Sequence, residues 1–263
     1  MAAVGEEPST PRPCFLCLDH LPQGQKGILY RGEHLILCNP MPVFFPHFTV
    51  SHLNHREQRI EEQIDSFLRL IADLGSGWAV LYNGARCGAS APDHLHYQLV
   101  PSGQMPIEKE ILEKERRALL TPVGTSSLYR LKGLGREVVV LEGTDSIGVG
   151  DTFRRFLSAL RKTLHTAEEP MINVAGYGTH DKGSQGRWRL LIFPRRKHRP
   201  EAFFRKGEER LVISPGVIDM GGVFVAPMER DFERLNTTLV EGIYQEVSLE
   251  ERVVEKAIGQ APT

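Results

Sequence analysis

Residues 88–98 have the sequence Gly88-Ala89-Ser90-Ala91-Pro92-Asp93-His94-Leu95-His96-Tyr97-Gln98. From the first histidine onward, polar residues alternate with apolar or aromatic ones. Because successive side chains of a β-strand point to opposite faces, we expect both histidines and the final glutamine to share one face. The leucine and tyrosine between them would then face the core. The alternative interpretation is a solvent-exposed edge strand on which the histidines have no function.

Two imidazoles and one amide on the same strand face are suited to metal binding and to chemistry at phosphorus. A neutral imidazole attacks phosphorus well when its other nitrogen donates to a fixed acceptor, because that hydrogen bond sets the tautomer. A metal bound by His94 would hold the strand in place and so position His96. The amide of Gln98 can donate to a phosphoryl oxygen but cannot act as an acid or a base. His96 is therefore a candidate nucleophile, and Gln98 is a candidate phosphate ligand.

Four cysteines are present, and Cys14 and Cys17 form a C-x-x-C pair. Such a pair is a common half-site for zinc, which prefers four tetrahedral ligands from cysteine and histidine. Among the histidines, His94 is the best candidate for a third ligand and His55 is the next. The competing histidines are His47 and His52. The alternative is a pair of buried or redox-active cysteines that binds no metal.

Two further segments carry groups that can hold phosphate. The loop after the strand at 78–83 can supply backbone N–H groups, an amide and a hydroxyl. Its candidate residues are Asn83, Gly88 and Ser90. A basic cluster follows an apolar strand and Pro194, and its candidate residues are Arg195 and Arg196. We interpret the neighbouring Lys197 and Arg199 as surface charge.

The chain has 263 residues, of which 41% are hydrophobic and 25% are charged, and its formal net charge is -1. These values are typical of a globular protein and give no reason to expect nucleic acid or a membrane as a partner. Residues 1–12 are polar and contain proline, so we expect a flexible tail. They lack the basic start and apolar core of a signal peptide, and no apolar run approaches the ~18 residues of a spanning helix. We therefore expect a cytoplasmic protein.

The hydrophobic pattern predicts an α+β fold made of two related halves, 13–120 and 121–263. The first half has short strands around one long helix at 56–74, in which apolar residues recur every three or four positions. The second half repeats this order loosely, with its long helix at 151–166. A charged helix is expected at 108–119. The other expected strands are 28–30, 34–38, 47–52, 78–83, 137–141, 171–174, 187–194, 210–213 and 222–225.

The run from Asn83 to Gln98 resembles the H-x-H-x-Q motif of the nucleotidyltransferase branch of the HIT superfamily. That branch contains galactose-1-phosphate uridylyltransferase, diadenosine tetraphosphate phosphorylase and GDP-hexose phosphorylases. In the second half, residues 172–174 and 186–196 are similar to the C-terminal segment of the diadenosine phosphorylases. The sequence departs from the pattern at Asp93, since two of these groups place the first histidine directly after proline. The resemblance implies a HIT-like antiparallel sheet with flanking helices, built from two tandem halves.

The same resemblance implies roles for individual residues. His96 would form a covalent nucleotidyl-histidine, and Gln98 would hold the α-phosphoryl group. The residues that would bind a structural zinc ion are Cys14, Cys17, His55 and His94. Asn39 occupies a region that lines the nucleoside pocket in this superfamily. The other substrate contacts would come from Asn83, Gly88, Ser90, Arg195 and Arg196.

The implied function is transfer of a nucleoside monophosphate from a nucleotide sugar or a dinucleoside polyphosphate to phosphate or a sugar phosphate, by a monomer or a homodimer. Two alternatives stay open. HIT-type hydrolases pass the nucleotide to water, and they carry a third histidine, able to protonate a leaving group, where Gln98 stands. A zinc-bearing nucleotide-binding module without turnover would not need the pair formed by His96 and Gln98.

Overall fold

The computed structural model describes residues 13–179 and 186–262. The strands are β1 (Gly27–Tyr30), β2 (His34–Cys38), β3 (Phe48–His52), β4 (Trp78–Asn83), β5 (His96–Pro101), β6 (Arg117–Val123), β7 (Ser126–Leu131), β8 (Val138–Gly143), β9 (Ile172–Thr179) and β10 (Arg187–Pro194). The α-helices are α1 (Ile64–Leu74), α2 (Ile107–Glu110), α3 (Ser146–Leu164), α4 (Val217–Met220), α5 (Glu229–Arg234), α6 (Thr237–Val247) and α7 (Glu251–Gln260). The tail expected at 1–12 lies outside the described residues.

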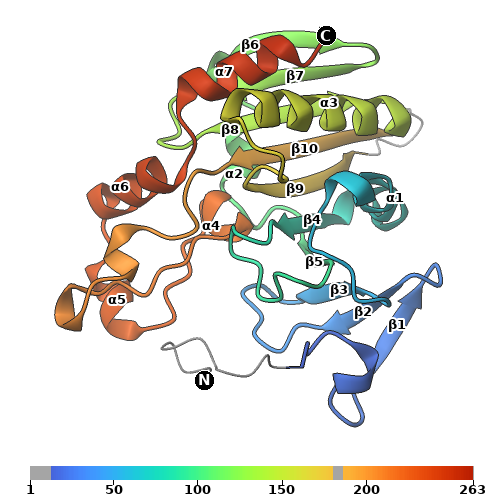
Figure 1. Cartoon of the computed structure of the whole chain (residues 1–263), viewed down its shortest axis with the longest axis vertical. Helices are drawn as coiled ribbons and strands as arrows, with labels where there is room; N and C mark the ends of the chain where they lie inside the picture. Colours follow the sequence, from blue (N-terminus) through green and yellow to red (C-terminus); the bar gives the residue numbers. More distant parts are fainter. Residues whose placement is uncertain (1–12, 180–185, 263) are drawn as a thin grey trace.

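The strands of the described residues form one 10-stranded sheet, in the order β1-β2-β3-β5-β4-β9-β10-β8-β7-β6 (Figure 1). The pairs β3–β5, β5–β4 and β4–β9 at its centre are antiparallel. This arrangement confirms the expected α+β class with an antiparallel sheet and flanking helices.

The two halves of the sheet repeat one topology. Strands β1 to β5, with α1 after β3, pair in the order β1-β2-β3-β5-β4. Strands β6 to β10, with α3 after β8, pair in the equivalent order β6-β7-β8-β10-β9, and the halves join where β4 pairs with β9. Residue 120 lies inside β6. We therefore propose that the division between the halves falls just before Arg117 and not after residue 120.

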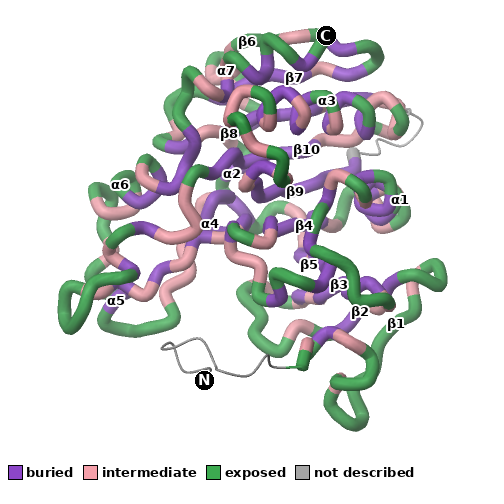
Figure 2. The backbone as a smooth tube through the Cα atoms, in the orientation of Figure 1, coloured by how far each residue is buried: buried purple, intermediate pink, exposed green. Residues whose placement is uncertain are grey.

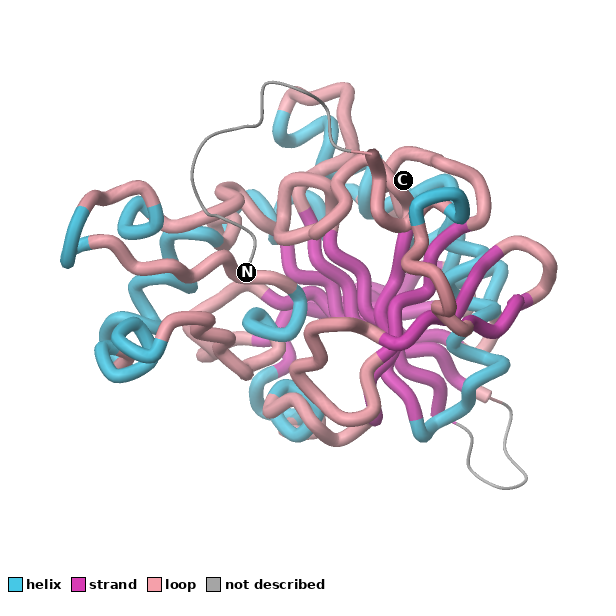
Figure 3. Tube along the Cα trace, turned by 90° about the horizontal axis from the view of Figure 1, so that it is seen from below, coloured by secondary structure: helices cyan, strands magenta, loops and turns pink. Residues whose placement is uncertain are grey.

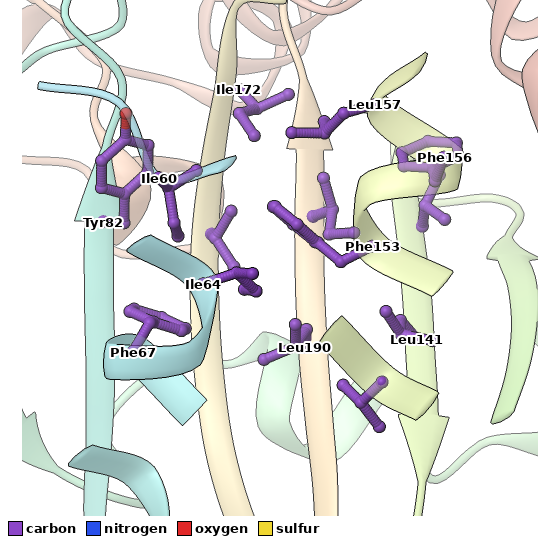
Figure 4. Close-up of a cluster of buried hydrophobic side chains, with 14 of the residues drawn as sticks. Ile60, Ile64, Phe67, Tyr82, Leu141, Phe153, Phe156, Leu157, Ile172 and Leu190 are labelled. Atoms are coloured by element: carbon purple, nitrogen blue, oxygen red, sulfur yellow. The ribbon is translucent and has the colours of Figure 1, made fainter. Parts of the chain in front are cut away.

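One face of the sheet is covered by α1 and α3, and α7 packs against α3. Figure 4 shows Phe67 of α1 and Phe153 of α3 in the layer between these helices and strand residues such as Tyr82 and Leu190. Burial of each such side chain contributes about 1.5–3 kcal/mol. Helix α3 begins where the Asp145 carboxylate accepts hydrogen bonds from two backbone N–H groups of the first turn, an N-cap that the sequence-based start at 151 missed.

The opposite face of the sheet is covered by α2, α4 and α6. Helices therefore flank the strands on both sides, as Figure 3 shows. Figure 2 shows that β9, at the centre of the sheet, is largely buried. No helix within the described residues is both long enough and apolar enough to cross a membrane.

The predicted helix at 56–74 begins later than expected, because its first residues pair with other segments. The carbonyl of Arg56 accepts from the backbone N–H of Leu95 at 2.7 Å, and the carbonyl of Gln58 accepts from the Tyr82 hydroxyl at 2.9 Å. These carbonyls are therefore engaged outside any helix. A short 3-10 helix at Glu61–Gln63 leads into α1.

The predicted helix at 108–119 is wrong beyond its first turn. Helix α2 ends at Glu110, and Arg117 begins β6, which pairs with β7 across a turn at Gly124. Since β6 is an edge strand, charged residues suit it as well as they suit an exposed helix, and the pattern did not separate the two. The strands expected at 210–213 and 222–225 are also wrong, because these described residues form no strand.

His34, the first residue of β2, is buried as a neutral imidazole. Its exposed fraction is 2%, and neither ring nitrogen has a hydrogen-bond partner within the described residues. Burial lowers the pKa of His34 to about 4, and the neighbouring His52 acts in the same direction while Glu33 opposes it. The unfolded chain takes up this proton near pH 6.5, so acid favours the unfolded state between that pH and the folded pKa.

We expect the His34→Phe variant to resist acid better than the parent protein. The parent should lose about 2 kcal/mol more of its free energy of unfolding between pH 7 and pH 5 than the variant does. Urea unfolding at the two pH values measures this difference. An equal loss in both proteins would mean that protonation of His34 does not limit acid stability.

Candidate active site and metal centre

The His94–Gln98 segment lies in the middle of the sheet. Strand β5 pairs with β3 on one side and β4 on the other, so the edge-strand interpretation is wrong. The expected alternation is confirmed for Leu95 and Tyr97, which lie in the core layer against α1. The strand begins only at His96, and His94 lies in the bend before it. His94 therefore belongs to the bend before the strand, and His96 belongs to β5 itself.

Cys14, Cys17, His55 and His94 come together as a group that can bind a metal ion. Their four ligand atoms all lie within 4.8 Å of one another. The Nδ1 atom of His94 lies 3.3 Å from Cys14 Sγ and 3.5 Å from Cys17 Sγ, and His55 Nδ1 lies 3.3 Å from Cys17 Sγ. A tetrahedral zinc ion with ordinary bond lengths would separate sulfur from nitrogen by about 3.6 Å. The donor set and its spacing therefore fit such an ion.

The outer nitrogens of both histidines in this group are also held. His94 Nε2 donates to the carbonyl of His52 at 2.8 Å, and His55 Nε2 lies 3.4 Å from a carboxylate oxygen of Asp93. The hydrogen bond of His94 is of the kind that fixes the tautomer and orientation of a metal-binding imidazole, whereas the His55–Asp93 contact is an ion-pair distance between exposed groups. Asp93, the residue that departs from the H-x-H-x-Q pattern, thus lies beside His55, a candidate metal ligand. His52, a competitor for the metal in the sequence, contributes through its backbone.

The His96 imidazole is buried, and one nitrogen is free. Its Nδ1 lies 2.8 Å from the carbonyl oxygen of His94. A carbonyl can only accept, so Nδ1 carries the proton and Nε2 carries the lone pair. Nε2 is buried without a hydrogen-bond partner in the described part of the chain, and burial lowers the pKa of His96 so that it stays neutral. A neutral imidazole in this tautomer can act as a nucleophile.

Gln58 fixes the start of β5, a role that the sequence did not reveal. Its Oε1 accepts from the backbone N–H of His96 at 2.8 Å, and its Nε2 donates to the carbonyl of Asn83 at 2.8 Å. The buried side chain therefore links the end of β4 to the start of β5. No local signal marks this residue, because it lies in a segment with a helical pattern.

His47 holds Gln98 in one orientation. The backbone N–H of Val43 donates to His47 Nδ1 at 3.1 Å, so the proton of this imidazole is on Nε2. That Nε2 donates to Gln98 Oε1 at 2.7 Å, and burial lowers the pKa of His47, which keeps it neutral. Because His47 holds its oxygen, the Gln98 amide has its NH2 group free to donate to a ligand.

Asn83 is oriented in the same way from the other side. Its Oδ1 accepts from the backbone N–H of Val217 and from the Asn173 amide, each at 2.7 Å. Its Nδ2 group has no acceptor in the described part of the chain. Asn83 and Gln98 therefore both line the cavity as hydrogen-bond donors.

A cavity of about 1100 Å³ lies between the two halves of the chain. The predicted site residues that line it are Asn39, Asn83, Gly88, Ser90, His96 and Gln98. Arg195 and Arg196 are not among the lining residues. The Arg195 guanidinium is buried and donates to Asn173 Oδ1 and the Pro215 carbonyl, while Arg196 donates to two carbonyls in α6. Arg199 and Arg210 line the cavity in their place.

Comparison with known proteins agrees with this architecture. A family model described as a domain of unknown function (DUF4922) matches residues 1–101. No curated protein matches the chain significantly in sequence. The solved structure of yeast Ap4A phosphorylase Apa2 in complex with Ap4A is 17% identical, with a TM-score of 0.57, and the match covers 83% of this chain and 74% of that one. Its complex with AMP gives the same identity and coverage, with a TM-score of 0.56.

At 17% identity, this similarity establishes a shared fold. The chain therefore shares the fold of the yeast Ap4A phosphorylase Apa2, one of the enzyme types that the resemblance of the His94–Gln98 motif pointed to.

Proposed function

We propose that the protein is a nucleotidyltransferase of the phosphorylase type and that His96 is its nucleophile. The observation that carries this proposal is the buried, unpartnered Nε2 of His96 in a cavity lined by two amide donors. A lone pair held in this way is costly to bury unless a ligand uses it. The alternative of a binding module without turnover gives no reason for a nucleophile fixed in one tautomer.

In the proposed reaction, His96 Nε2 attacks the α-phosphorus of the donor. A P–N bond forms, the P–O bond to the rest of the donor breaks, and the leaving phosphate takes the electron pair. An oxygen of an acceptor phosphate then attacks the same phosphorus, and the electron pair of the P–N bond returns to Nε2. The Nδ1 proton stays on its hydrogen bond to the His94 carbonyl throughout. No proton transfer to or from the imidazole is needed.

Asn83 and Gln98 are the proposed ligands of the transferred phosphoryl group. Both present NH2 groups whose amide oxygens are already engaged, so the donors need no reorganisation during the reaction. Neither amide can protonate a leaving group or activate water. This chemistry favours transfer over hydrolysis. The backbone N–H groups and the hydroxyl of the Gly88–Ser90 loop could bind phosphate in either reaction and do not separate the two.

The metal group is proposed to hold a structural zinc ion, bound by Cys14, Cys17, His55 and His94. Such an ion would cross-link the N-terminal segment to the bend before β5 and supply no step of the reaction. The His94 carbonyl accepts the Nδ1 proton of His96, so the position of His94 bears directly on the tautomer of the nucleophile.

The proposed substrates are a dinucleoside polyphosphate or a nucleotide sugar as donor, with phosphate or a sugar phosphate as acceptor. The cavity, of about 1100 Å³, is slightly larger than the ~300–1,000 Å³ usual for small-molecule sites, which suits a ligand of two joined parts. The yeast enzyme with the shared fold was solved with Ap4A and with AMP, and these ligands support a nucleotide here.

A phosphorolysis screen tests this function. Purified protein is mixed with Ap4A, UDP-glucose, GDP-glucose or ADP-glucose, with and without inorganic phosphate, and the products are separated by ion-exchange chromatography. We expect at least one donor to give a nucleoside diphosphate only when phosphate is present. Release of a nucleoside monophosphate at the same rate without phosphate would identify a hydrolase. No consumption of any donor would favour a binding module.

The His47→Ala variant is expected to turn over about 10- to 100-fold more slowly than the parent, because Gln98 loses the bond that orients its amide. Steady-state turnover with the best donor measures this loss. If His47 acts through Gln98, the loss in the double variant with Gln98→Ala should be no larger than in Gln98→Ala alone. Additive losses would contradict this positioning role. His165→Asn, a change at the left-handed C-cap of α3, is the matched control.

A further inference from the structure

Two arginines on the C-terminal wall of the cavity have no counter-charge. Arg199 and Arg210 are the sole arginine or lysine side chains among the described lining residues, and neither forms an ion pair within the described part of the chain. The sole carboxylate in the lining is Asp219, whose two oxygens accept from the backbone N–H groups of Gly216 and Val225. That carboxylate is therefore engaged with backbone and not with either arginine.

The two guanidinium groups are held in place by neutral contacts. Arg199 Nε donates to Ser214 Oγ at 2.9 Å, and its Cζ lies 4.2 Å from the centroid of the Phe203 ring. Arg210 Cζ lies 5.4 Å from the same centroid, and its buried Nε has no hydrogen-bond partner in the described residues. Burial lowers the pKa of Arg199, and no acidic group opposes this effect. Partly buried cations without a counter-charge favour an anion that completes the site.

The two walls of the cavity differ in charge in a way that suits nucleotidyl transfer. The wall that carries His96 offers neutral amide donors, from Asn83 and Gln98. The C-terminal part of the lining offers two guanidinium groups whose terminal N–H donors have no partner in the described part of the chain, and such groups match phosphate oxygens in geometry and charge. During transfer between phosphates, negative charge accumulates on the departing oxygen and the acceptor brings its own charge. Cations are therefore most useful beside the phosphate that is not transferred.

We propose that Arg199 and Arg210 form the subsite for the leaving phosphate and, in the second half-reaction, for the acceptor phosphate. The role of the subsite in catalysis rests on the proposed function. Its affinity for phosphate rests only on the charge and geometry of the two arginines. The ligand class is a phosphate dianion, either inorganic phosphate or a phosphate monoester. By this account the subsite excludes acceptors that lack a phosphate, such as water or a plain sugar.

Binding of inorganic phosphate to the full-length protein tests the subsite without turnover. We expect isothermal titration calorimetry to show that Arg199→Ala and Arg210→Ala each bind phosphate at least about tenfold more weakly than the parent. The lysine variants at the same positions keep the charge and should lose less. Arg205→Ala is the matched control, since this exposed arginine lies on the same segment but does not line the cavity.

The possible results distinguish failure of the phosphate subsite from failure of the proposed function. Equal phosphate affinity in the parent and in the double alanine variant, or no measurable binding to the parent, would overturn the subsite even if His96 forms an adduct. Loss of phosphate binding in the arginine variants, in a protein that never forms an adduct, would keep the subsite and remove the proposed function. Thermal unfolding of each variant, with the lysine variants as references, shows that the fold is intact.

Discussion

The His96→Ala variant is expected to lose nucleotidyl transfer by a factor on the order of 10⁴ or more, because no other group lies in its place to attack the donor. The expected loss is in turnover and not in donor binding, since Asn83 and Gln98 keep their positions. The initial rate of phosphorolysis, compared between parent and variant at saturating donor, measures the effect.

The fold should survive this substitution. The substitution removes one buried hydrogen bond, from His96 Nδ1 to the His94 carbonyl, while Nε2 has no protein partner to lose within the described residues and Gln58 still holds the backbone of residue 96. The variant should therefore fold with a melting temperature lowered by only about 2–10 °C, the effect of about one lost hydrogen bond, and calorimetric binding of a donor should persist. Full turnover in the variant would exclude His96 as the nucleophile.

Loss of the proposed zinc ion is expected to have the largest effect on stability. The Cys14→Ser and Cys17→Ser variants should lose metal binding, and the thermal midpoint should fall by about 10 °C or more, since a structural zinc site contributes several kcal/mol to folding. Elemental analysis should find one zinc per chain in the parent and much less in each variant. Phosphorolysis should also slow, because His94 holds the Nδ1 proton of His96 through its carbonyl.

Cys38→Ser provides the control for these variants, because Cys38 is exposed and lies outside the metal group. Its metal content and thermal midpoint should match those of the parent. A parent protein that contains no metal, or one whose midpoint does not change in the presence of a strong chelator, would contradict the structural role of the site.

The local patterns of the sequence predicted the elements around the site well. The alternation after His94 placed Tyr97 in the core and His96 on the cavity side, because side-chain direction along a strand is a local property. The C-x-x-C spacing, with His55 and His94, predicted the group that the structure brings together. These features depend on few residues, and each has a definite spacing.

Contacts between distant segments could not be predicted in the same way. Arg195 and Arg199 both follow β10, and the sequence favoured Arg195 for phosphate. The chain forms a β-bridge between Arg195 and Ser248 at this point, which turns the first guanidinium inward and leaves the second on the cavity. Gln58 and His47 act through partners that lie 38 and 51 residues away in the chain. Only the folded structure reveals these pairs.

The most direct test of the central claim is mass spectrometry of the covalent intermediate. The protein is mixed with the donor found in the screen, without phosphate, and digested with trypsin, which should release the peptide 87–109 that contains both His94 and His96. We predict one added nucleoside monophosphate on this peptide, assigned to His96 by fragmentation and lost when phosphate is added. An adduct on another residue, or turnover without any adduct, would contradict the account.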